Sequence, residues 1–304
     1  MSTPRISGTC RAFTNGPVYK DIPYNEKNLV DFSCFRHLST KLSSYLSIKY
    51  VRSGTEMYNL GGRSYNITQG RYLLTNKHST GSVTIDSDKD VNGICIAISP
   101  ALLSEVIGTH HDPSGPYPRE DFYDFLTTAS FFEHDYKATN TALGQYLQNN
   151  LATLTPADLT DQLLLSQVFY SLAANLVADQ REIHGYINSF TSVRDSTRKD
   201  LLHRMLKGKE FMDDCYTDRI SITAIARAAT MSEYYFLRLF KQMFRSSPHR
   251  YIVERRLQKA HDLLRTTDIP ISTIADSCGF NDVHTFSKTF KKRYGFGPAA
   301  ARQQ

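Results

Sequence analysis

Residues 269–298 read IPISTIADSCGFNDVHTFSKTFKKRYGFGP, and residues 220–248 read ISITAIARAATMSEYYFLRLFKQMFRSSP. The two stretches match at a spacing of 49 residues before the turn and 50 after it. The matched pairs are Ile220/Ile269, Ile222/Ile271, Ile225/Ile274, Ala226/Ala275, Phe236/Phe286, Phe240/Phe290, Lys241/Lys291 and Pro248/Pro298. Each copy has the pattern of a short helix, a tight turn and a longer basic helix. The sequence therefore predicts two helix-turn-helix units in tandem.

Capping residues bound the helices predicted around this repeat. Side chains that can accept hydrogen bonds from a first helical turn stand at Ser196, Ser221, Ser232 and Asp282. They predict helices over 197–213, 222–229, 233–245 and, last in the chain, 283–294. Pro248 opens a helix that runs to about residue 265, and Gly279 closes one that begins near residue 272. The C-terminal third is predicted to be all-α.

Wheel positions divide the second helix of each unit into two faces. The apolar stripes contain Phe236, Leu239, Phe240 and Met243 in the first unit, and Phe286 and Phe290, with Arg293 at the edge, in the second. The opposite faces carry Tyr234, Arg238, Lys241, Arg245, His284, Lys288 and Lys291, with Leu237 and Ser287 on the flanks. Such a basic face suits the major groove of DNA. On wheel position alone, Tyr234 and Leu237 could equally pack against the preceding helix.

The net charge of +6 is unevenly distributed. Residues 201–304 hold 18 Lys and Arg against 10 Asp and Glu, whereas residues 1–200 hold 18 against 20. A basic third on a slightly acidic remainder is typical of a nucleic-acid-binding domain, although an anionic membrane surface would satisfy the same charge balance. The helix over 248–266 would be about 28 Å long. That is close to the roughly 34 Å between major-groove faces one turn apart.

The N-terminal half carries short β-rich runs between turn residues. The runs include 45–51, 63–67, 82–85 and a last strand over 94–98, and the expected turns lie at Gly54, Gly61-Gly62, Gly70, Gly81 and Gly93. This rhythm predicts a small antiparallel barrel or jelly roll. Helices are expected from Pro100, over 121–129, over 138–154 and over 159–185, the last buried against the barrel, a second subunit or both. A polar stretch over 188–195 predicts a linker.

The C-terminal third resembles the signature of AraC-type transcriptional regulators. The resemblance rests on Arg255-Arg256-Leu257, Ala260, Leu263-Leu264, Ile274-Ala275, Cys278-Gly279-Phe280, Asp282, Phe286, Phe290-Lys291, Gly295 and Pro298. It implies two helix-turn-helix subdomains bridged by a linker helix and attached to a cupin-like sensor or dimerisation domain. It also implies base contacts from Tyr234, Leu237, Arg238, His284, Ser287 and Lys288. The sequence departs from the family pattern at Ala301, where an aromatic residue usually stands.

The outward basic side chains Lys241, Arg245, Lys291 and Lys292 are expected to contact DNA phosphates. No effector-binding residue is predicted, because the register of the barrel strands cannot be fixed from the sequence. The barrel could take a small molecule or serve as a docking surface for another protein. A cupin metalloenzyme with an accessory DNA-binding domain is the alternative, but the sequence lacks the His-x-His pattern with a following Glu. His78 and the His110-His111 pair do not supply it.

These observations define an α+β protein with no catalytic residues, metal or cofactor expected. The predicted parts are a sensing or dimerisation domain over 1–158, a long helix and linker over 159–195, and a DNA-binding domain over 196–304. The five widely spaced cysteines predict reduced structural thiols, and no apolar run predicts a signal peptide or membrane span. The expected function is that of a homodimeric transcription regulator, an activator because the resemblance implies it. It would act in the bacterial cytoplasm at the nucleoid, with duplex DNA and RNA polymerase as partners and no membrane.

Overall fold

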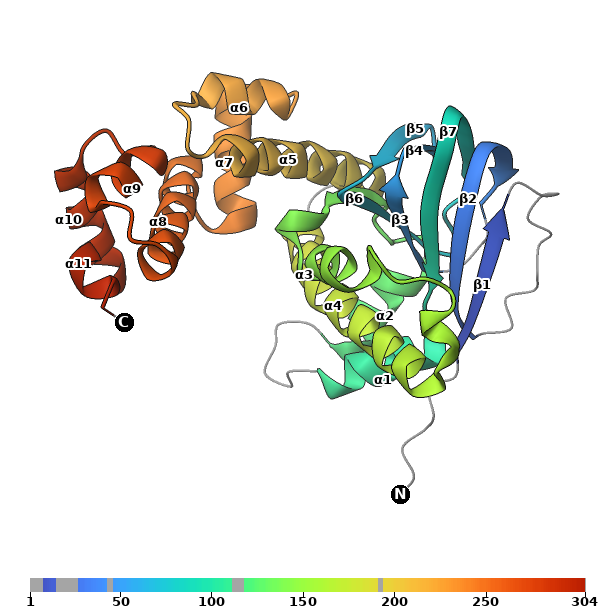
Figure 1. Ribbon diagram of the computed structural model, residues 1–304. Helices are drawn as coiled ribbons and strands as arrows, with labels where there is room; N and C mark the ends of the chain where they lie inside the picture. The colour runs from blue at the N-terminus through green and yellow to red at the C-terminus, as the bar shows by residue number, and fades with distance from the viewer. Residues whose placement is uncertain (1–7, 15–26, 43–45, 111–117, 191–193, 304) are drawn as a thin grey trace. The chain divides into compact units, whose positions relative to one another are not determined.

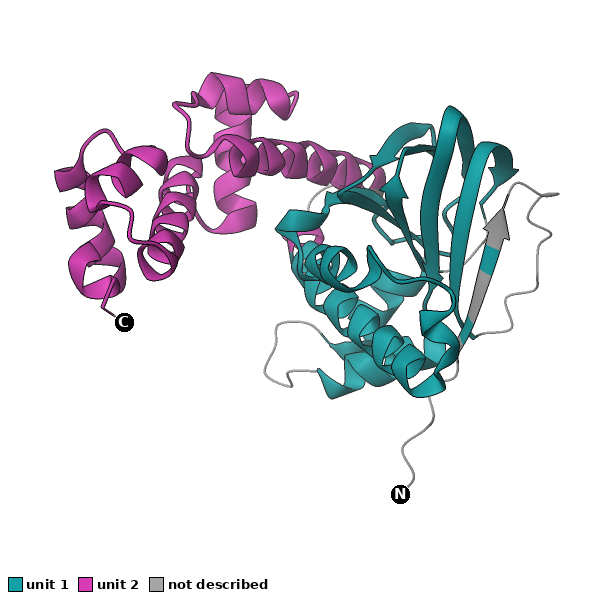
Figure 2. Cartoon of the chain, in the orientation of Figure 1, with its two compact units in different colours: residues 1–185 teal, residues 186–304 magenta. Residues whose placement is uncertain are grey.

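The computed structural model describes residues 8–14, 27–42, 46–110, 118–190 and 194–303. The chain divides into two compact units, residues 1–185 and residues 186–304 (Figure 2). Within the described residues, the first unit combines a β-sheet with four α-helices, and the second contains α-helices and no strand (Figure 1). Among the described residues no helix is long and apolar enough to cross a membrane.

One sheet of eight strands forms the barrel of the first unit. The strands are β1 (Gly8–Thr14), β2 (Asn28–Lys41), β3 (Ser47–Ser53), β4 (Thr55–Leu60), β5 (Arg63–Thr68), β6 (Arg71–Thr75), β7 (Gly81–Ala97) and β8 (His134–Lys137). The main order is β1-β2-β7-β3-β6-β8, and β4 pairs with both β5 and β7. All pairings are antiparallel except β1 with β2. The predicted antiparallel barrel is therefore confirmed, with one parallel edge.

Strand β7 corrects the expectation of two strands separated by a turn at Gly93. It runs unbroken through both predicted segments and pairs with β2 along most of its length. A Cβ atom on Gly93 would lie 2.3 Å from Glu56 Oε1, so glycine is needed there for space. Gly81 also differs from the prediction of a turn, because it is the first residue of β7 and has no positive φ. Gly54, Gly61-Gly62 and Gly70 have positive φ and form the predicted turns.

Helices α1 (Pro100–Thr109), α2 (Arg119–Thr127), α3 (Ala142–Tyr146) and α4 (Gln162–Asn188) lie on one side of the sheet (Figure 1). The helix expected over 138–154 is interrupted. A short turn over 138–140 precedes α3, and a π-helical segment over 147–151 follows it. The chain must fold back tightly here, because a Cβ atom on Gly144 would lie 2.3 Å from Ala138 Cα. Helix α4 confirms the long helix and buries Leu165, Phe169, Leu172 and Leu176.

The second unit contains the tandem repeat. Its helices are α5 (Asp195–Cys215), α6 (Ile222–Ala228), α7 (Glu233–Phe244), α8 (Pro248–Thr266), α9 (Ile271–Ser277), α10 (Val283–Tyr294) and α11 (Pro298–Ala301). Ser221, Ser232 and Asp282 accept first-turn N–H groups as predicted. Ser196 does not, because α5 begins at Asp195, two residues before the predicted start, with Arg194 in the cap position. Helix α11 was not predicted, and Ala301 is fully buried where the family pattern has an aromatic residue.

Each helix-turn-helix unit has its own apolar core. In the first helix-turn-helix unit, Phe236 and Phe240 are fully buried, with ring centroids 5.5 Å apart. In the second, Phe286 and Phe290 repeat this packing at the same separation. The second core also contains Leu257, Ala260, Leu264, Ile274, Ala275, Cys278, Phe280 and Ala301. Helix α8 joins the two units and contributes three of these buried side chains.

The two copies differ where the backbone is left-handed. The second copy places Gly279 (φ 81°) after α9 and Gly295 (φ 85°) after α10. The first copy places Thr230 (φ 52°) and Arg245 (φ 53°) at the equivalent points. A β-branched side chain is costly in this region, by roughly 1–2 kcal/mol, whereas glycine adopts it without steric cost.

Thr230→Gly is therefore expected to raise the free energy of unfolding by up to about 1 kcal/mol. The gain from relieved backbone strain exceeds the loss from greater freedom of the unfolded chain. Urea denaturation of the full-length chain measures the change. Thr223→Gly, in the first turn of α6, is the matched control and should destabilise by about 1 kcal/mol, because it loses the hydrogen bond from Thr223 Oγ1 to Glu233 Oε1 and some helix propensity. Destabilisation by Thr230→Gly would show that the Thr230 side chain, which donates to Ala229 O, outweighs the strain.

Candidate nucleic-acid interface

Helix α7 presents the predicted contact residues of the first helix-turn-helix unit to solvent. Ser232 caps the helix, and the stripe of Phe236, Leu239, Phe240 and Met243 is buried. Burial of this stripe fixes the rotation of the helix about its axis, so that the opposite face is exposed. The Tyr234 side chain is 78% exposed and that of Leu237 is 41% exposed. Both residues therefore leave the core, which resolves the alternative that the wheel left open.

Arg238 is exposed beside these two residues. Its guanidinium carbon lies 5.2 Å from the centre of the Tyr235 ring, within range of a cation–π interaction. The ring restricts the motion of the arginine side chain while its N–H donors remain available. A pre-positioned guanidinium can donate two hydrogen bonds to the O6 and N7 acceptors of guanine.

Helix α10 repeats this arrangement with more polar side chains. Asp282 accepts hydrogen bonds from Thr285 N at 2.7 Å and from Thr285 Oγ1 at 2.8 Å, and these bonds lower the pKa of the Asp282 carboxyl. The cap fixes the first turn, from which His284 projects into solvent, and Lys288 is exposed one turn further along the helix. Ser287 is half-buried on the flank. The exposed face of α10 therefore offers hydrogen-bonding groups, whereas α7 offers Tyr234 and Leu237 beside one arginine.

Val283, which was not among the predicted contact residues, is 43% exposed in the first turn of α10. An apolar side chain exposed beside His284 can contact the methyl group of thymine. The available signal was a valine directly after the capping Asp282, at the position where the first copy has Glu233. Val283 belongs with the candidate contact residues.

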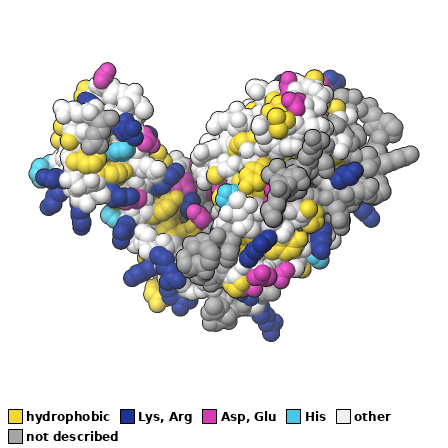
Figure 3. Space-filling model, turned by 90° about the horizontal axis from the view of Figure 1, so that it is seen from below, with side chains coloured by type: hydrophobic (Ala, Val, Ile, Leu, Met, Phe, Trp, Pro, Cys, Tyr) yellow, Lys and Arg dark blue, Asp and Glu magenta, His cyan; other side chains and the backbone are white. Residues whose placement is uncertain are grey.

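The four residues predicted to contact phosphates are all exposed: Lys241, Arg245, Lys291 and Lys292. Arg245 ends α7 in a left-handed conformation. Arg293, at the edge of the α10 stripe, instead forms an ion pair with Glu254 of α8. Lys and Arg side chains are gathered on the face of the second unit that Figure 3 shows. Such side chains can neutralise phosphates and release bound counterions.

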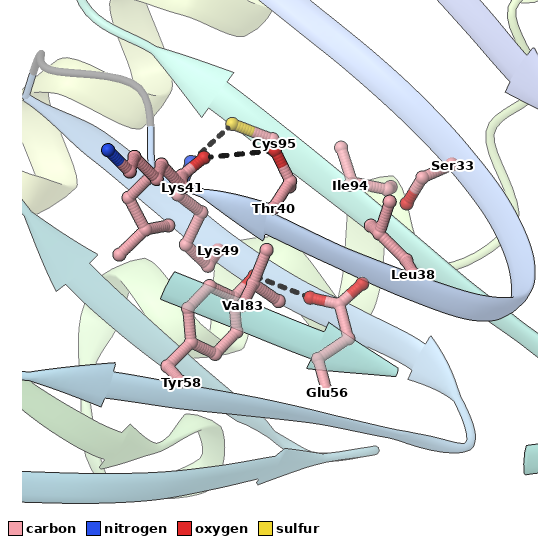
Figure 4. Close-up of a pocket in the computed structure, with 11 residues that line it drawn as sticks. Ser33, Leu38, Thr40, Lys41, Lys49, Glu56, Tyr58, Val83, Ile94 and Cys95 are labelled. Carbon is pink, nitrogen blue, oxygen red and sulfur yellow. Dashed lines mark hydrogen bonds between the residues drawn. The ribbon is translucent and has the colours of Figure 1, made fainter. Parts of the chain in front are cut away.

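The barrel, within residues 1–185, contains a small cavity of about 40 Å³ whose wall combines polar and apolar side chains (Figure 4). The Lys49 ammonium donates to Cys95 Sγ at 2.8 Å, and the Tyr58 hydroxyl donates to Glu56 Oε2 at 2.5 Å. Burial raises the pKa of the Glu56 carboxyl, and the Tyr58 hydrogen bond and Lys49 oppose that rise. Burial also raises the pKa of the Cys95 thiol. The Lys49 ammonium and the Glu56 carboxyl both lie in the wall of this cavity. Burying a charged group inside a barrel costs free energy.

The structure brings no metal site together within the residues that it describes. His78 and His110 belong to no group of three or more His, Cys, Asp or Glu side chains in those residues. His111 lies outside the described residues. Cys34, Cys95, Cys215 and Cys278 are free thiols, and Cys278 is buried in the second apolar core.

Comparisons with known proteins agree with both units. A family model described as an AraC-like ligand binding domain matches residues 36–173, and one described as a helix-turn-helix domain matches residues 225–304. Together the two models cover more than half of the chain. The chain belongs to the AraC-type family of transcriptional regulators.

Individual relatives match different lengths of the chain. The transcriptional activator RhaS of Escherichia fergusonii is 37% identical over 93 residues, which is 31% of this chain and 34% of that protein. The chain thus spans about a third of the length of this activator. YdeC of Bacillus subtilis, an uncharacterised transcriptional regulator, is 22% identical over 254 residues, 83% of this chain and 82% of its own. A solved AraC-type regulator from Chromobacterium violaceum has 30% identity over 33% of this chain and 90% of its own, with a TM-score of 0.32.

Proposed function

We propose that the protein is a sequence-specific DNA-binding regulator of transcription and not an enzyme. The observation that carries the proposal is the shared geometry of α7 and α10. Each buries a phenylalanine stripe and exposes the residues expected to read bases: Tyr234, Leu237, Arg238, His284, Ser287 and Lys288. Ser287 is the least exposed of them. The family of the chain and the basic charge of residues 201–304 support the same assignment.

In this proposal the two helices enter adjacent segments of the major groove of one duplex. The base-reading side chains discriminate sequence, and Lys241, Arg245, Lys291 and Lys292 hold the phosphates. Activation through RNA polymerase is the favoured outcome, since RhaS is an activator. The protein would act in the bacterial cytoplasm, on the nucleoid.

The first unit is proposed to sense a signal and to dimerise. We assign sensing to residues 1–158 and the dimer contact to residues 159–195. Leu163 is 68% exposed and Leu164 is 37% exposed at the start of α4, which leaves apolar surface for a second copy of the chain. The cavity beside Lys49 and Glu56 is the candidate effector site, and at about 40 Å³ it would have to widen to admit a ligand, since small-molecule pockets measure roughly 300–1,000 Å³. The charged and hydroxyl groups in its wall, Lys49, Glu56 and Tyr58, favour a ligand with hydrogen-bonding groups over a purely apolar one.

Arg238→Ala and Lys288→Ala are each expected to lower the affinity for a specific site by about 1–3 kcal/mol, because each removes a base contact. The site is first obtained by selecting full-length protein against random duplex DNA. Affinities for that site and for a random duplex are then measured at several salt concentrations.

Lys207→Ala is the matched control, because Lys207 is an exposed cation on α5 and lies outside both reading faces. It should lose only the small electrostatic contribution of one charge. Equal losses on specific and random DNA would reduce Arg238 and Lys288 to phosphate contacts. If selection enriches no sequence at all, the proposed function is wrong.

A further inference from the structure

We propose that Arg256 of helix α8 fixes the two helix-turn-helix units relative to each other and so sets the half-site spacing that the protein accepts. This inference rests on the proposed function. The role is one of positioning, since Arg256 lies on the helix that joins the units and on neither reading helix.

The Arg256 guanidinium donates three hydrogen bonds to three backbone carbonyls. Its Nε donates to Tyr216 O at 2.5 Å, and its Nη2 donates to Asp218 O at 2.9 Å. Both acceptors lie in the segment that links α5 to α6, in the first helix-turn-helix unit. Its Nη1 donates to Gly279 O at 2.6 Å, in the turn between α9 and α10 of the second unit. The Arg256 side chain thus ties the backbone of the first helix-turn-helix unit to the backbone of the second helix-turn-helix unit.

The two backbone segments also contact each other directly. A Cβ atom on Gly279 would lie 2.3 Å from Thr217 O and 3.1 Å from Arg256 Cζ. Only glycine lets the turn of the second unit approach the 216–218 segment so closely. The approach gives Arg256 acceptors on both sides within reach of one planar group.

Other cations of α8 hold the same segment from one side. The Arg255 guanidinium lies 5.7 Å from the centre of the Tyr216 ring, and Lys259 Nζ lies 5.8 Å from it. Arg256 differs from them because it also donates a hydrogen bond to Gly279 O, in the turn between α9 and α10. Arg256 is therefore the side chain that can couple the two units.

The chemistry of this joint requires arginine. Three donors in one rigid plane match three carbonyls at fixed positions, whereas a lysine ammonium has no such fork. Partial burial lowers the pKa of Arg256, yet a guanidinium remains charged. The cores of the two units contain other side chains, Phe236 and Phe240 in one and Leu257, Ala260 and Phe290 in the other. Loss of the guanidinium should therefore loosen the joint and leave both units folded.

A rigid joint has a measurable effect on DNA recognition. One extra base pair between half-sites rotates the second groove segment by about 34° around the duplex axis, given 10–10.5 base pairs per turn. A rigid pair of units cannot follow this rotation, so it loses contacts at one half-site. A loosened pair can follow it, at the cost of lower affinity for the original site.

The test uses full-length wild type, Arg256→Lys and Arg256→Gln, with Arg265→Lys on the exposed face of α8 as the matched control. Wild type is first selected against random duplex DNA to define the two half-motifs. Affinities are then measured for that site and for versions with one base pair inserted or removed between the halves. Thermal unfolding of each variant reports whether the helical domain over residues 186–304 is folded.

For wild type and Arg265→Lys, a changed spacing should lower affinity on the order of tenfold or more, the effect of a base-pair mismatch. For both Arg256 variants the same change should lower affinity by less than about threefold, or under 1 kcal/mol. Variants that bind all sites more weakly but keep the wild-type spacing preference would overturn the inference, as would unfolding of both variants. A wild type that selects no bipartite site would overturn the proposed function, and this inference with it.

Discussion

Replacing Asp213 with Asn is expected to lower the free energy of unfolding of the C-terminal unit by about 3 kcal/mol. The Asp213 side chain is 2% exposed and lies between α5 and α8. It accepts a hydrogen bond from Tyr251 Oη at 2.6 Å and from Lys209 Nζ at 2.9 Å, and Arg255 Nε lies 3.1 Å away. Asn can keep one neutral hydrogen bond, but it leaves two cations without their counter-charge. Breaking a buried ion pair costs roughly 3–5 kcal/mol, and the loss here falls at the low end because the Lys209 and Arg255 side chains are 24% and 35% exposed to water.

Chemical denaturation of the full-length chain measures the loss, and hydrogen exchange in α5 and α8 assigns it to the right transition. The matched control is Asp268→Asn, an exposed carboxylate in the loop after α8, which should change stability by less than about 0.5 kcal/mol. An equally small effect of Asp213→Asn would mean that water replaces the lost carboxylate. Asp213 would then contribute little to the packing of α5 on α8.

Gly279→Ala should destabilise the same unit by about 3 kcal/mol or more, for two reasons that add. A methyl group on a left-handed residue costs roughly 1–2 kcal/mol. The same methyl group would also lie 2.3 Å from Thr217 O and 2.9 Å from Thr217 C, both backbone atoms that cannot move by a rotamer change. The turn must therefore separate from the 216–218 segment, which removes the Arg256 bond to Gly279 O.

Gly295→Ala separates the two contributions. Gly295 has φ 85°, close to the 81° of Gly279, but a Cβ atom there meets nothing within 4 Å. Its replacement should cost only the conformational penalty of about 1–2 kcal/mol. The difference between the two variants in urea denaturation isolates the steric contact. Equal losses would show that the chain accommodates the methyl group at Gly279 without opening the joint.

The second unit could be predicted closely from the sequence because its determinants are local. Ser221, Ser232 and Asp282 each cap a helix within three residues of themselves, and the phenylalanine pairs lie four residues apart. The prediction of Ser196 as a cap was wrong, since α5 starts at Asp195 and a serine can also occupy a first turn. Helix ends are less sharply encoded than helices.

The barrel was predicted in outline only, because strand pairing is not local. Strand β2 escaped notice since Asn28–Phe32 is mostly buried and shows no alternation of polar and apolar residues. Gly93 resembled a turn residue, but its role follows from Glu56 on another strand. The same limit applies to the bonds of Asp213 with Tyr251 and of Arg256 with Gly279, which join residues more than 20 positions apart in the sequence. Exposure of Arg238, His284 and Lys288, by contrast, followed from helical periodicity, whereas periodicity left the exposure of Tyr234 and Leu237 open.

The pairing of β7 with β2 has a consequence for how the chain folds during synthesis. Leu29 pairs with Ala97 and Asp31 with Cys95, so the centre of the barrel joins segments that leave the ribosome far apart in time. The second unit packs mainly helices that follow one another, such as α5 with α6 and α9 with α10. Contacts between sequence neighbours form quickly, whereas distant strand pairs form slowly. The helical unit can fold as it emerges, but β2 has no antiparallel partner until β7 has been translated.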